Sequence, residues 1–404
     1  MSFVRFALAA TVLAATGLFG SPAVAAPDCG MNTGRAADGV PIPIGAIVTA
    51  SGAADISSGT KGAKAYFDCV NANGGIHGRP IDYSYDDDQT RPDKAAEIAK
   101  KMVEDKKAVA LIGSSSLVDC IATSQYYQQA GIISLMAGGV APQCFNARNI
   151  ATTNAGPRYG LLVAVKYAVE TLHVKHMACP QPTVPGADWV CAGVAGYVKP
   201  KGVAYSHFTF DQQSADYDSL VLRIVQTGAD STIFLGSPPT IVPFLAAAEH
   251  ADVGDKLKIL APSPVYFPEL PKTVGPYWND RFWVAIEWAP TDSGGRDMDN
   301  FLAVMKAYNA SPGSLAEGGY LAARIAVQAL MSIPVDKIDR AAVTAALQNV
   351  QDFKSDIFCT PWSFGPRDAT SRLGNRSGWI AVIHAGNWKV LPGCVTLDQS
   401  MVMK

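Results

Sequence analysis

The apolar run Ala108–Ile112 constrains the fold of this chain most, because it stops sharply at Gly113. Its length and β-branched content are typical of a strand that is covered on both faces of a parallel sheet. The residues from Leu117 to Ala130 then follow a helical pattern. Three serines occupy the turn between strand and helix: Ser114, Ser115 and Ser116. Such a turn exposes backbone N–H groups at a helix N-terminus, so it predicts a place for a polar or anionic group.

A second strand and turn follow at once. Residues 131–136 are largely apolar, and the turn behind them, which ends at Pro142, contains only small residues: Ala137, Gly138 and Gly139. The carboxyl ends of neighbouring parallel strands lie at one edge of the sheet. The two turns therefore predict one half of a ligand site.

Strand and helix patterns alternate along the whole chain. In the first part, strands are expected at 42–49, 81–85, 108–112 and 131–136, with helices at 58–72, 92–105 and 117–130. From residue 159 the alternation restarts, with strands at 175–179, 204–209, 231–235, 258–261 and 282–288 and helices at 161–172, 187–198 and 241–250. The C-terminal part is expected to contain helices at 297–308, 315–331 and 340–347 and an antiparallel pair of strands around 379–383 and 388–391. This order predicts an α/β fold with doubly wound parallel sheets, whose second half repeats the first.

Charge and hydropathy exclude some classes of protein. The 404 residues carry 33 basic and 35 acidic side chains, a net charge of −2, without a basic cluster. We therefore expect no nucleic-acid binding. No segment after the N-terminal region reaches about 18 unbroken apolar residues, the length needed to span a membrane.

The N-terminal 26 residues are typical of a secretory signal peptide. Arg5 precedes the apolar run Phe6–Phe19, and Ala23–Ala25 supplies small residues for cleavage after Ala25, with Ala26 as the alternative. The residues before Cys29 lack the pattern of a lipoprotein site. We expect an exported, periplasmic protein without a lipid anchor.

The eight cysteines all follow this segment. An even number in an oxidising compartment indicates disulfides, although sequence alone does not fix their connectivity. The candidates fall into pairs along the chain: Cys120 and Cys144, Cys179 and Cys191, Cys359 and Cys394, and the remaining Cys29 and Cys69. No Cys-x-x-Cys occurs and the six histidines are scattered, so we expect no metal site and no cofactor.

Several segments resemble those of one known family. They are Ile44–Ala46 with Ser51–Gly52, the helix end Val70–Ile81, Asp86–Asp87, Ala110–Ser114 and Ala130–Ser134, in this order and spacing. Together they resemble the type I periplasmic solute-binding proteins of ABC importers, in particular the group that binds leucine, isoleucine and valine. The spacing of Cys120 and Cys144 also resembles that group.

The resemblance implies two lobes joined by a three-stranded hinge, closing around a ligand that is delivered to membrane permease subunits. It places lobe one at 27–157 plus 289–360 and lobe two at 158–288 plus 361–404. We expect a monomer. The alternatives are a ligand-sensing receptor subunit of the same fold and, less favoured, a secreted hydrolase, for which neither a nucleophile elbow nor a P-loop is present.

The resemblance also implies ligand-binding positions. A ligand carboxylate would meet Ser115–Ser116 and Ala137–Gly139, with Arg158 as a further anion partner. The remaining candidates flank the predicted turns and crossovers: Ser51, Ser114, Tyr159, Asp188, Trp189, Ser237, Ser263 and Tyr266. Alternatives stay open, because the serines can be helix caps, Arg158 a surface or hinge ion pair, and the aromatic residues core.

The second lobe departs from the amino-acid-binding pattern. The turn Ser263–Tyr266 lacks the acidic residue that meets an α-ammonium group in the family, and Gly236–Pro239 reads as a stiff apolar turn. An apolar or aromatic carboxylate, an uncharged amide or an amino-acid-like compound fits better with Trp189 and Tyr266.

Overall fold

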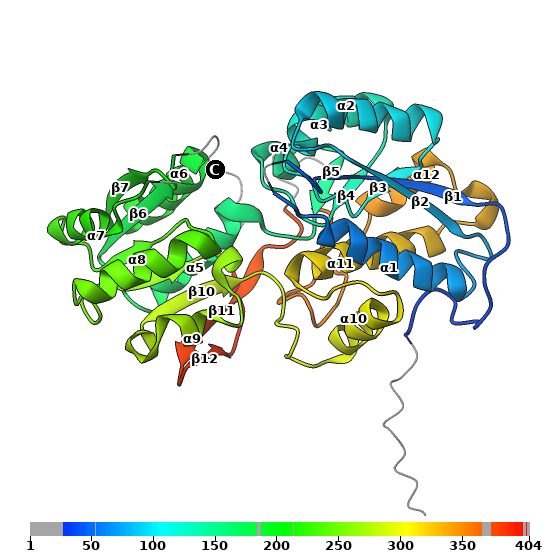
Figure 1. Ribbon diagram of the computed structural model, residues 1–404. Helices are drawn as coiled ribbons and strands as arrows, with labels where there is room; N and C mark the ends of the chain where they lie inside the picture. Colours follow the sequence, from blue (N-terminus) through cyan, green and yellow to red (C-terminus); the bar gives the residue numbers. More distant parts are fainter. Residues whose placement is uncertain are drawn as a thin grey trace, which may run out of the picture.

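The computed structural model of the protein describes residues 27–52, 54–183, 187–212, 214–365, 373–398 and 401. Figure 1 shows two lobes side by side, each a sheet covered by helices. The predicted signal peptide, residues 1–26, lies outside the described residues. Among the described helices, none combines the length and the apolar content of a membrane span.

The first sheet is entirely parallel, with the order β2-β1-β3-β4-β5. Its strands are β1 (Ile42–Val48), β2 (Ile81–Asp87), β3 (Ala110–Ile112), β4 (Ser134–Met136) and β5 (Ile150–Thr152). The connecting helices are α1 (Ser58–Ala72), α2 (Pro92–Lys100), which continues as a π-helix over Lys101–Asp105, α3 (Asp119–Ala130) and α4 (Pro142–Asn146). This is the doubly wound arrangement expected from the sequence.

The second sheet repeats that order and extends it. Its parallel part runs β7-β6-β8-β9-β10, and β11 and β12 join antiparallel beyond β10. The strands are β6 (His176–Pro182), β7 (Ala204–Phe210), β8 (Ser231–Ile233), β9 (Lys258–Ala261), β10 (Phe282–Ile286), β11 (Ser377–His384), β12 (Asn387–Val390) and the short β13 (Val395–Thr396), which pairs with β11. The predicted repetition of the first half by the second is confirmed.

The helices show how the chain returns between lobes. α5 (Gly156–Glu170), α6 (Ala187–Val198), α7 (Tyr217–Gln226), α8 (Pro238–His250) and α9 (Leu270–Val274) cover the second sheet. α10 (Arg296–Ala307), α11 (Ser314–Met331) and α12 (Arg340–Gln348) pack on the first lobe, where they share a core with α1. The described chain therefore crosses between the lobes before α5, after β10 and before β11, as Figure 1 shows. The residue limits of the lobes given above stay a prediction.

Two helix starts differ from expectation. The residues Gly236–Pro239 are not a free turn, because α8 begins at Pro238, and Ser237 precedes it with its N–H bonded to Thr240 Oγ1 (2.9 Å). Proline is favoured at the first helical position, where its missing N–H has no helical partner. α5 begins at Gly156 rather than residue 161, and α4 and β5 were not expected.

Close packing of α1 and α11 depends on glycine. A Cβ atom at Gly62 would lie 2.3 Å from the carbonyl oxygen of Ala316, and one at Gly319 would lie 1.7 Å from that of Gly59. The two backbones therefore touch, which holds the first turn of α11 above the carboxyl edge of the first sheet.

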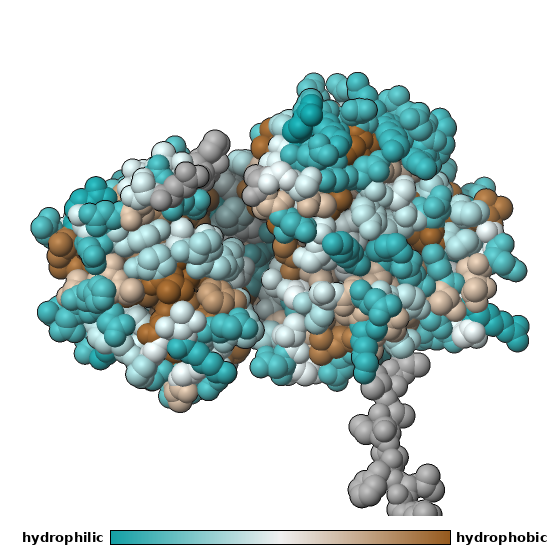
Figure 2. All heavy atoms as spheres, viewed as in Figure 1, coloured by the Kyte–Doolittle hydropathy of each residue, from teal (hydrophilic) through white to brown (hydrophobic). Residues whose placement is uncertain are grey.

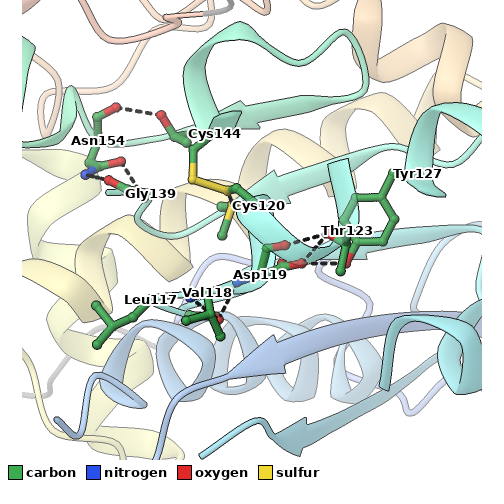
Figure 3. The surroundings of a disulfide bond; sticks show 12 residues. Leu117, Val118, Asp119, Cys120, Thr123, Tyr127, Gly139, Cys144 and Asn154 are labelled. Carbon is green, nitrogen blue, oxygen red and sulfur yellow. Dashed lines mark hydrogen bonds between the residues drawn. A yellow bond between two sulfur atoms is a disulfide. The ribbon is translucent and has the colours of Figure 1, made fainter. Parts of the chain in front are cut away.

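Four disulfides join the eight cysteines: Cys29–Cys69, Cys120–Cys144, Cys179–Cys191 and Cys359–Cys394. The expected pairs are therefore present. Cys120–Cys144 connects the start of α3 to α4, close to the turns that follow β3 and β4 (Figure 3).

Candidate functional site

The candidate site is the cleft between the lobes, where the carboxyl ends of both sheets come together. Figure 2 shows the surface hollowed between the two lobes. From lobe one, the turns after β3 and β4 and the first turn of α11 lie at this edge; lobe two contributes the turn after β9. Ligands of doubly wound sheets bind at such edges.

The three serines after β3 are buried and engaged within lobe one. Ser114 Oγ accepts a hydrogen bond from the N–H of Ile47 (3.1 Å), and Ser115 Oγ donates to the carbonyl of Ile56 (2.6 Å). Each serine is at most 1% exposed. Their hydroxyl groups therefore organise the turn in this conformation.

Ser116 acts as a cap at the start of α3. Its Oγ accepts from the N–H groups of Val118 (3.1 Å) and Asp119 (2.9 Å) and donates to Asp88. Figure 3 shows Leu117, Val118 and Asp119 in this turn beside the Cys120–Cys144 disulfide. The arrangement matches the capping alternative for this serine, while a role in ligand binding stays a prediction.

The residues of the turn after β4 are also buried and hydrogen-bonded within lobe one. Ala137, Gly138 and Gly139 are buried, and the N–H of Gly139 donates to Asn154 Oδ1 (2.9 Å). The first turn of α11 lies over it, since a Cβ atom at Gly138 would contact Leu315 at 3.3 Å. This helix joins the cleft from a part of the sequence for which no functional residue was predicted.

Glu317, in that first turn of α11, is the most unusual residue at the cleft. It is only 2% exposed, and burial raises the pKa of its carboxyl group to about 8. Among the described residues, its carboxyl group has no hydrogen-bond partner. Sequence reasoning missed it because an acidic residue in the first turn of a helix is common and favourable.

Trp288 follows β10 and Tyr266 follows β9 in the chain. The indole of Trp288 packs against α11, because a Cβ atom at Gly318 would lie 2.9 Å from its Cζ2 atom. Its Nε1 is buried and without a partner among the described residues. Tyr266, from lobe two, has a pKa raised to about 12, mainly by burial and further by the acidic groups Asp292 and Glu317. The ring of Tyr266 packs against that of Trp388 from β12, with the ring centroids 4.9 Å apart.

Glu287 connects the crossovers of the hinge. Its Oε2 accepts from the N–H groups of Ala155 (2.5 Å) and Gly156 (3.2 Å), and its Oε1 accepts from Ser263 Oγ (3.0 Å). Asn375, before β11, donates to the backbone carbonyl of Glu287 (3.2 Å). Burial raises the pKa of Glu287, and the hydrogen bonds from Ala155, Ser263 and Gly156 oppose that shift. Ser263 is thus engaged with the hinge.

An aromatic cluster joins the lobes near the first crossover. Phe145 of α4 stacks on Trp189 of α6 with ring centroids 6.3 Å apart, and Tyr159 meets both rings edge to face. Aromatic contacts of this kind add about 1 kcal/mol each beyond burial. Tyr159 and Trp189 therefore contribute to the contact between lobes.

Arg158 points elsewhere than expected. Its guanidinium group lies over the Trp189 ring at 5.0 Å and lines a small cavity of about 180 Å³ between α5 and α6. Burial lowers its pKa, and its Nε atom has no partner among the described residues. The contacts of the guanidinium group are with the rings of Tyr159 and Trp189, and the structure does not bring it to the serine turns.

The other candidates have local partners. Ser51 Oγ is exposed and donates to Asp87 Oδ2 (2.6 Å), and the exposed Asp188 accepts from Gln181 Nε2 (2.5 Å). A groove of about 1060 Å³ lies on lobe one beside α10 and α11, and the half-buried Arg324 that lines it is ion-paired with Asp297 (2.7 Å). In the part of the chain that the structure describes, no three metal-ligating side chains come together.

Comparison with known proteins agrees with this architecture. A family model described as periplasmic binding protein matches residues 41–387. The chain belongs to this family. It is a family of binding proteins, not of enzymes. A curated relative from Pseudomonas aeruginosa, named amino acid binding protein, is 27% identical to this periplasmic binding protein over 226 residues, 53% of this chain and 58% of the relative.

A second relative from the same organism, the leucine-, isoleucine-, valine-, threonine-, and alanine-binding protein, is 24% identical over 250 residues, 59% of this chain and 64% of the relative. The chain thus spans about six tenths of the length of these curated relatives.

Solved structures share the fold. A leucine binding protein from Thermotoga maritima superposes with a TM-score of 0.69 at 14% identity, covering 88% of this chain and 99% of that one. A solute binding protein from R. palustris in complex with benzoate gives 0.67 at 17% identity, covering 89% and 98%. At these identities, the likeness shows the fold alone.

Proposed function

We propose that this periplasmic binding protein captures a small apolar or aromatic carboxylate, or an amino-acid-like compound, between its two lobes and delivers it to the permease of an ABC importer. The observation that carries the proposal is the cleft itself, where the carboxyl ends of both sheets come together between the lobes. The ligand contacts both lobes only when they are closed, so it stabilises the closed state by that difference in affinity.

The lining of the cleft favours an acid with an apolar body. Tyr266 and Trp288 offer aromatic surface with polar ends, which suits such ligands. The related proteins point the same way: one binds benzoate, and the curated relatives are amino acid binding proteins. Export to the periplasm, predicted from residues 1–26, would place the protein where importers collect solutes.

A thermal-shift screen of the purified chain tests this function. The panel contains benzoate, phenylacetate, leucine, isoleucine, benzamide and glucose, each at 1 µM to 1 mM as a roughly tenfold dilution series. A ligand that binds only the native state raises the melting temperature in proportion to RT ln(1 + [L]/Kd). We expect a concentration-dependent rise with at least one carboxylate and none with glucose. No rise with any acid or amino acid would contradict the proposal.

Lobe closure gives an independent measurement. Binding of the positive compound should lower the radius of gyration in small-angle X-ray scattering, because the lobes approach each other. Binding with unchanged dimensions would leave the protein a binder but not one that closes as proposed.

A further inference from the structure

We propose that the cavity between α5 and α6 of lobe two binds a small oxyanion through the guanidinium group of Arg158. The cavity has a volume of about 180 Å³, and residues of both helices, of the turn after α6 and of the C-terminal segment line it. Its lining includes none of the turns that form the cleft. The inference therefore concerns a second site and does not depend on which ligand the cleft takes.

Arg158 is a buried cation without an acceptor. It is only 9% exposed, and among the described residues its guanidinium group makes neither an ion pair nor a hydrogen bond. Its contacts are with two rings, since the guanidinium carbon lies 5.0 Å from the ring centroid of Trp189 and 5.9 Å from that of Tyr159. Arginine is rarely buried without a paired group, because its five N–H groups only donate. These donors need an acceptor that the described chain does not supply.

The charges around the cavity leave one cation unbalanced. Lys201, which lines the cavity, is ion-paired with Glu170 (3.5 Å). Asp398, also in the lining, is ion-paired with Lys166 (3.1 Å). Three cations, with Arg158 as the third, therefore surround two acidic groups. Water in the cavity can accept hydrogen bonds from Arg158, but only an anion balances its charge.

Glycine residues of α6 keep the space beside Arg158 open. A Cβ atom at Gly193 would lie 2.5 Å from Arg158 Nε, so a side chain there would displace the guanidinium group. Gly196, one turn further, also lines the cavity, and a Cβ atom there would meet nothing within 4 Å. The cavity is larger than a single water molecule requires. A small anion therefore fits beside the guanidinium group without a change in the helices.

The chemistry of the lining favours an oxyanion over a halide. The planar fork of a guanidinium group donates two parallel hydrogen bonds to the paired oxygen atoms of a carboxylate, sulfate or phosphate group. The ammonium group of Lys201 offers further donors at the same cavity. Chloride has a single centre and cannot accept the two parallel bonds. We therefore expect the site to distinguish these oxyanions from chloride.

Isothermal titration calorimetry tests the site with sodium sulfate, phosphate and acetate, and with sodium chloride at matched ionic strength. At least one of the three oxyanions should bind with a Kd of about 1 mM or below, and chloride should not. Arg158→Met, which keeps the length of the side chain without its charge, should bind about tenfold or more weakly. Arg223→Met is the matched control, because Arg223 also lies over a ring, that of Phe208 (5.5 Å), but is exposed. It should bind like the unchanged protein.

The melting temperature separates anion binding from packing. Without an oxyanion, Arg158→Met should melt no lower than the unchanged protein, because the substitution removes a buried charge that lacks a partner. With the binding oxyanion present, the unchanged protein should melt higher and the variant should not respond, since a ligand stabilises only a state that binds it. A variant that melts lower by the same amount in both buffers would show that Arg158 only packs against Trp189.

The anions also identify the chemistry of the ligand. Binding of sulfate and phosphate alone would indicate a tetrahedral oxyanion, and binding of acetate alone a carboxylate. The proposal is wrong if none of the three binds, if chloride binds equally well, or if Arg158→Met keeps the Kd of the unchanged protein. Circular dichroism checks that each variant is folded. If Arg158→Met is not, Arg158→Lys, which keeps the charge without the planar fork, should show the same loss of about tenfold. Solute binding in the cleft is measured separately and is unaffected by these outcomes.

Discussion

The carboxylate of Glu287 accepts a hydrogen bond from the backbone N–H of Ala155 at 2.5 Å, which joins the second crossover of the hinge to the first. Gly156 and Ser263 bond to the same side chain. Because the N-terminus of α5 lies at these N–H groups, the carboxylate also faces the positive end of that helix. One acidic side chain thus fixes the geometry about which the lobes would move.

Replacing Glu287 by alanine should destabilise the protein. The change leaves two buried N–H groups and a hydroxyl group without their acceptor, so the free energy of unfolding should fall by about 2–4 kcal/mol. Urea unfolding followed by tryptophan fluorescence measures it. Glu249→Ala, on exposed surface, should change it by less than about 0.5 kcal/mol. Equal midpoints for the two variants would show that the hinge does not depend on Glu287.

More of the fold than of the candidate site could be predicted from the sequence. The strand β9 and the helix α6 have the expected limits, because apolar runs that end in turns of small residues mark where such elements begin and end. Glu317 could not be recognised, because an acidic residue in the first turn of a helix is usually exposed, whereas in the folded chain this one is only 2% exposed. The serines after β3 were easy to find, but their hydroxyl groups are engaged locally by Ile47, Ile56 and Asp88.

The four disulfides should differ in how readily they are reduced. Cys394 is exposed and Cys359 half-buried, whereas the other six cysteines are at most 2% exposed. Reduction needs access of an attacking thiolate to sulfur. In native protein, low concentrations of dithiothreitol should therefore open Cys359–Cys394 first, as measured by alkylation and mass spectrometry. Earlier labelling of Cys120 or Cys144 would contradict this order.

Asp119 should make stability depend on pH. It is fully buried, accepts hydrogen bonds from Thr123 (2.7 Å) and Tyr127 (2.8 Å), and burial raises its pKa from 3.8 to about 6 (Figure 3). Because the folded-state pKa is the higher one, its contribution to stability is present below pH 4 and is lost as the pH rises through 6.

The variant Asp119→Asn isolates this effect. Its oxygen keeps both acceptor roles without ionising, so the stability of the variant relative to the unchanged protein should improve by about 2–3 kcal/mol between pH 4 and pH 8. Urea midpoints at both pH values measure the change. A constant difference between the two proteins would mean that Asp119 does not titrate in this range.

Ser116→Ala separates a structural role from ligand binding. The hydroxyl group accepts from Val118 and Asp119 and donates to Asp88, so its loss leaves three buried groups short of a partner at the start of α3. We expect the free energy of unfolding without ligand to fall by about 1–2 kcal/mol, the usual cost of losing an N-cap. Ser51→Ala removes an exposed hydroxyl group that donates to Asp87 and should cost less than about 0.5 kcal/mol. Urea unfolding gives both values, and calorimetry with the panel carboxylate gives the affinities. Lower stability with unchanged affinity would identify Ser116 as a helix cap. Unchanged stability with at least tenfold weaker binding would instead show that its hydroxyl group contacts the ligand.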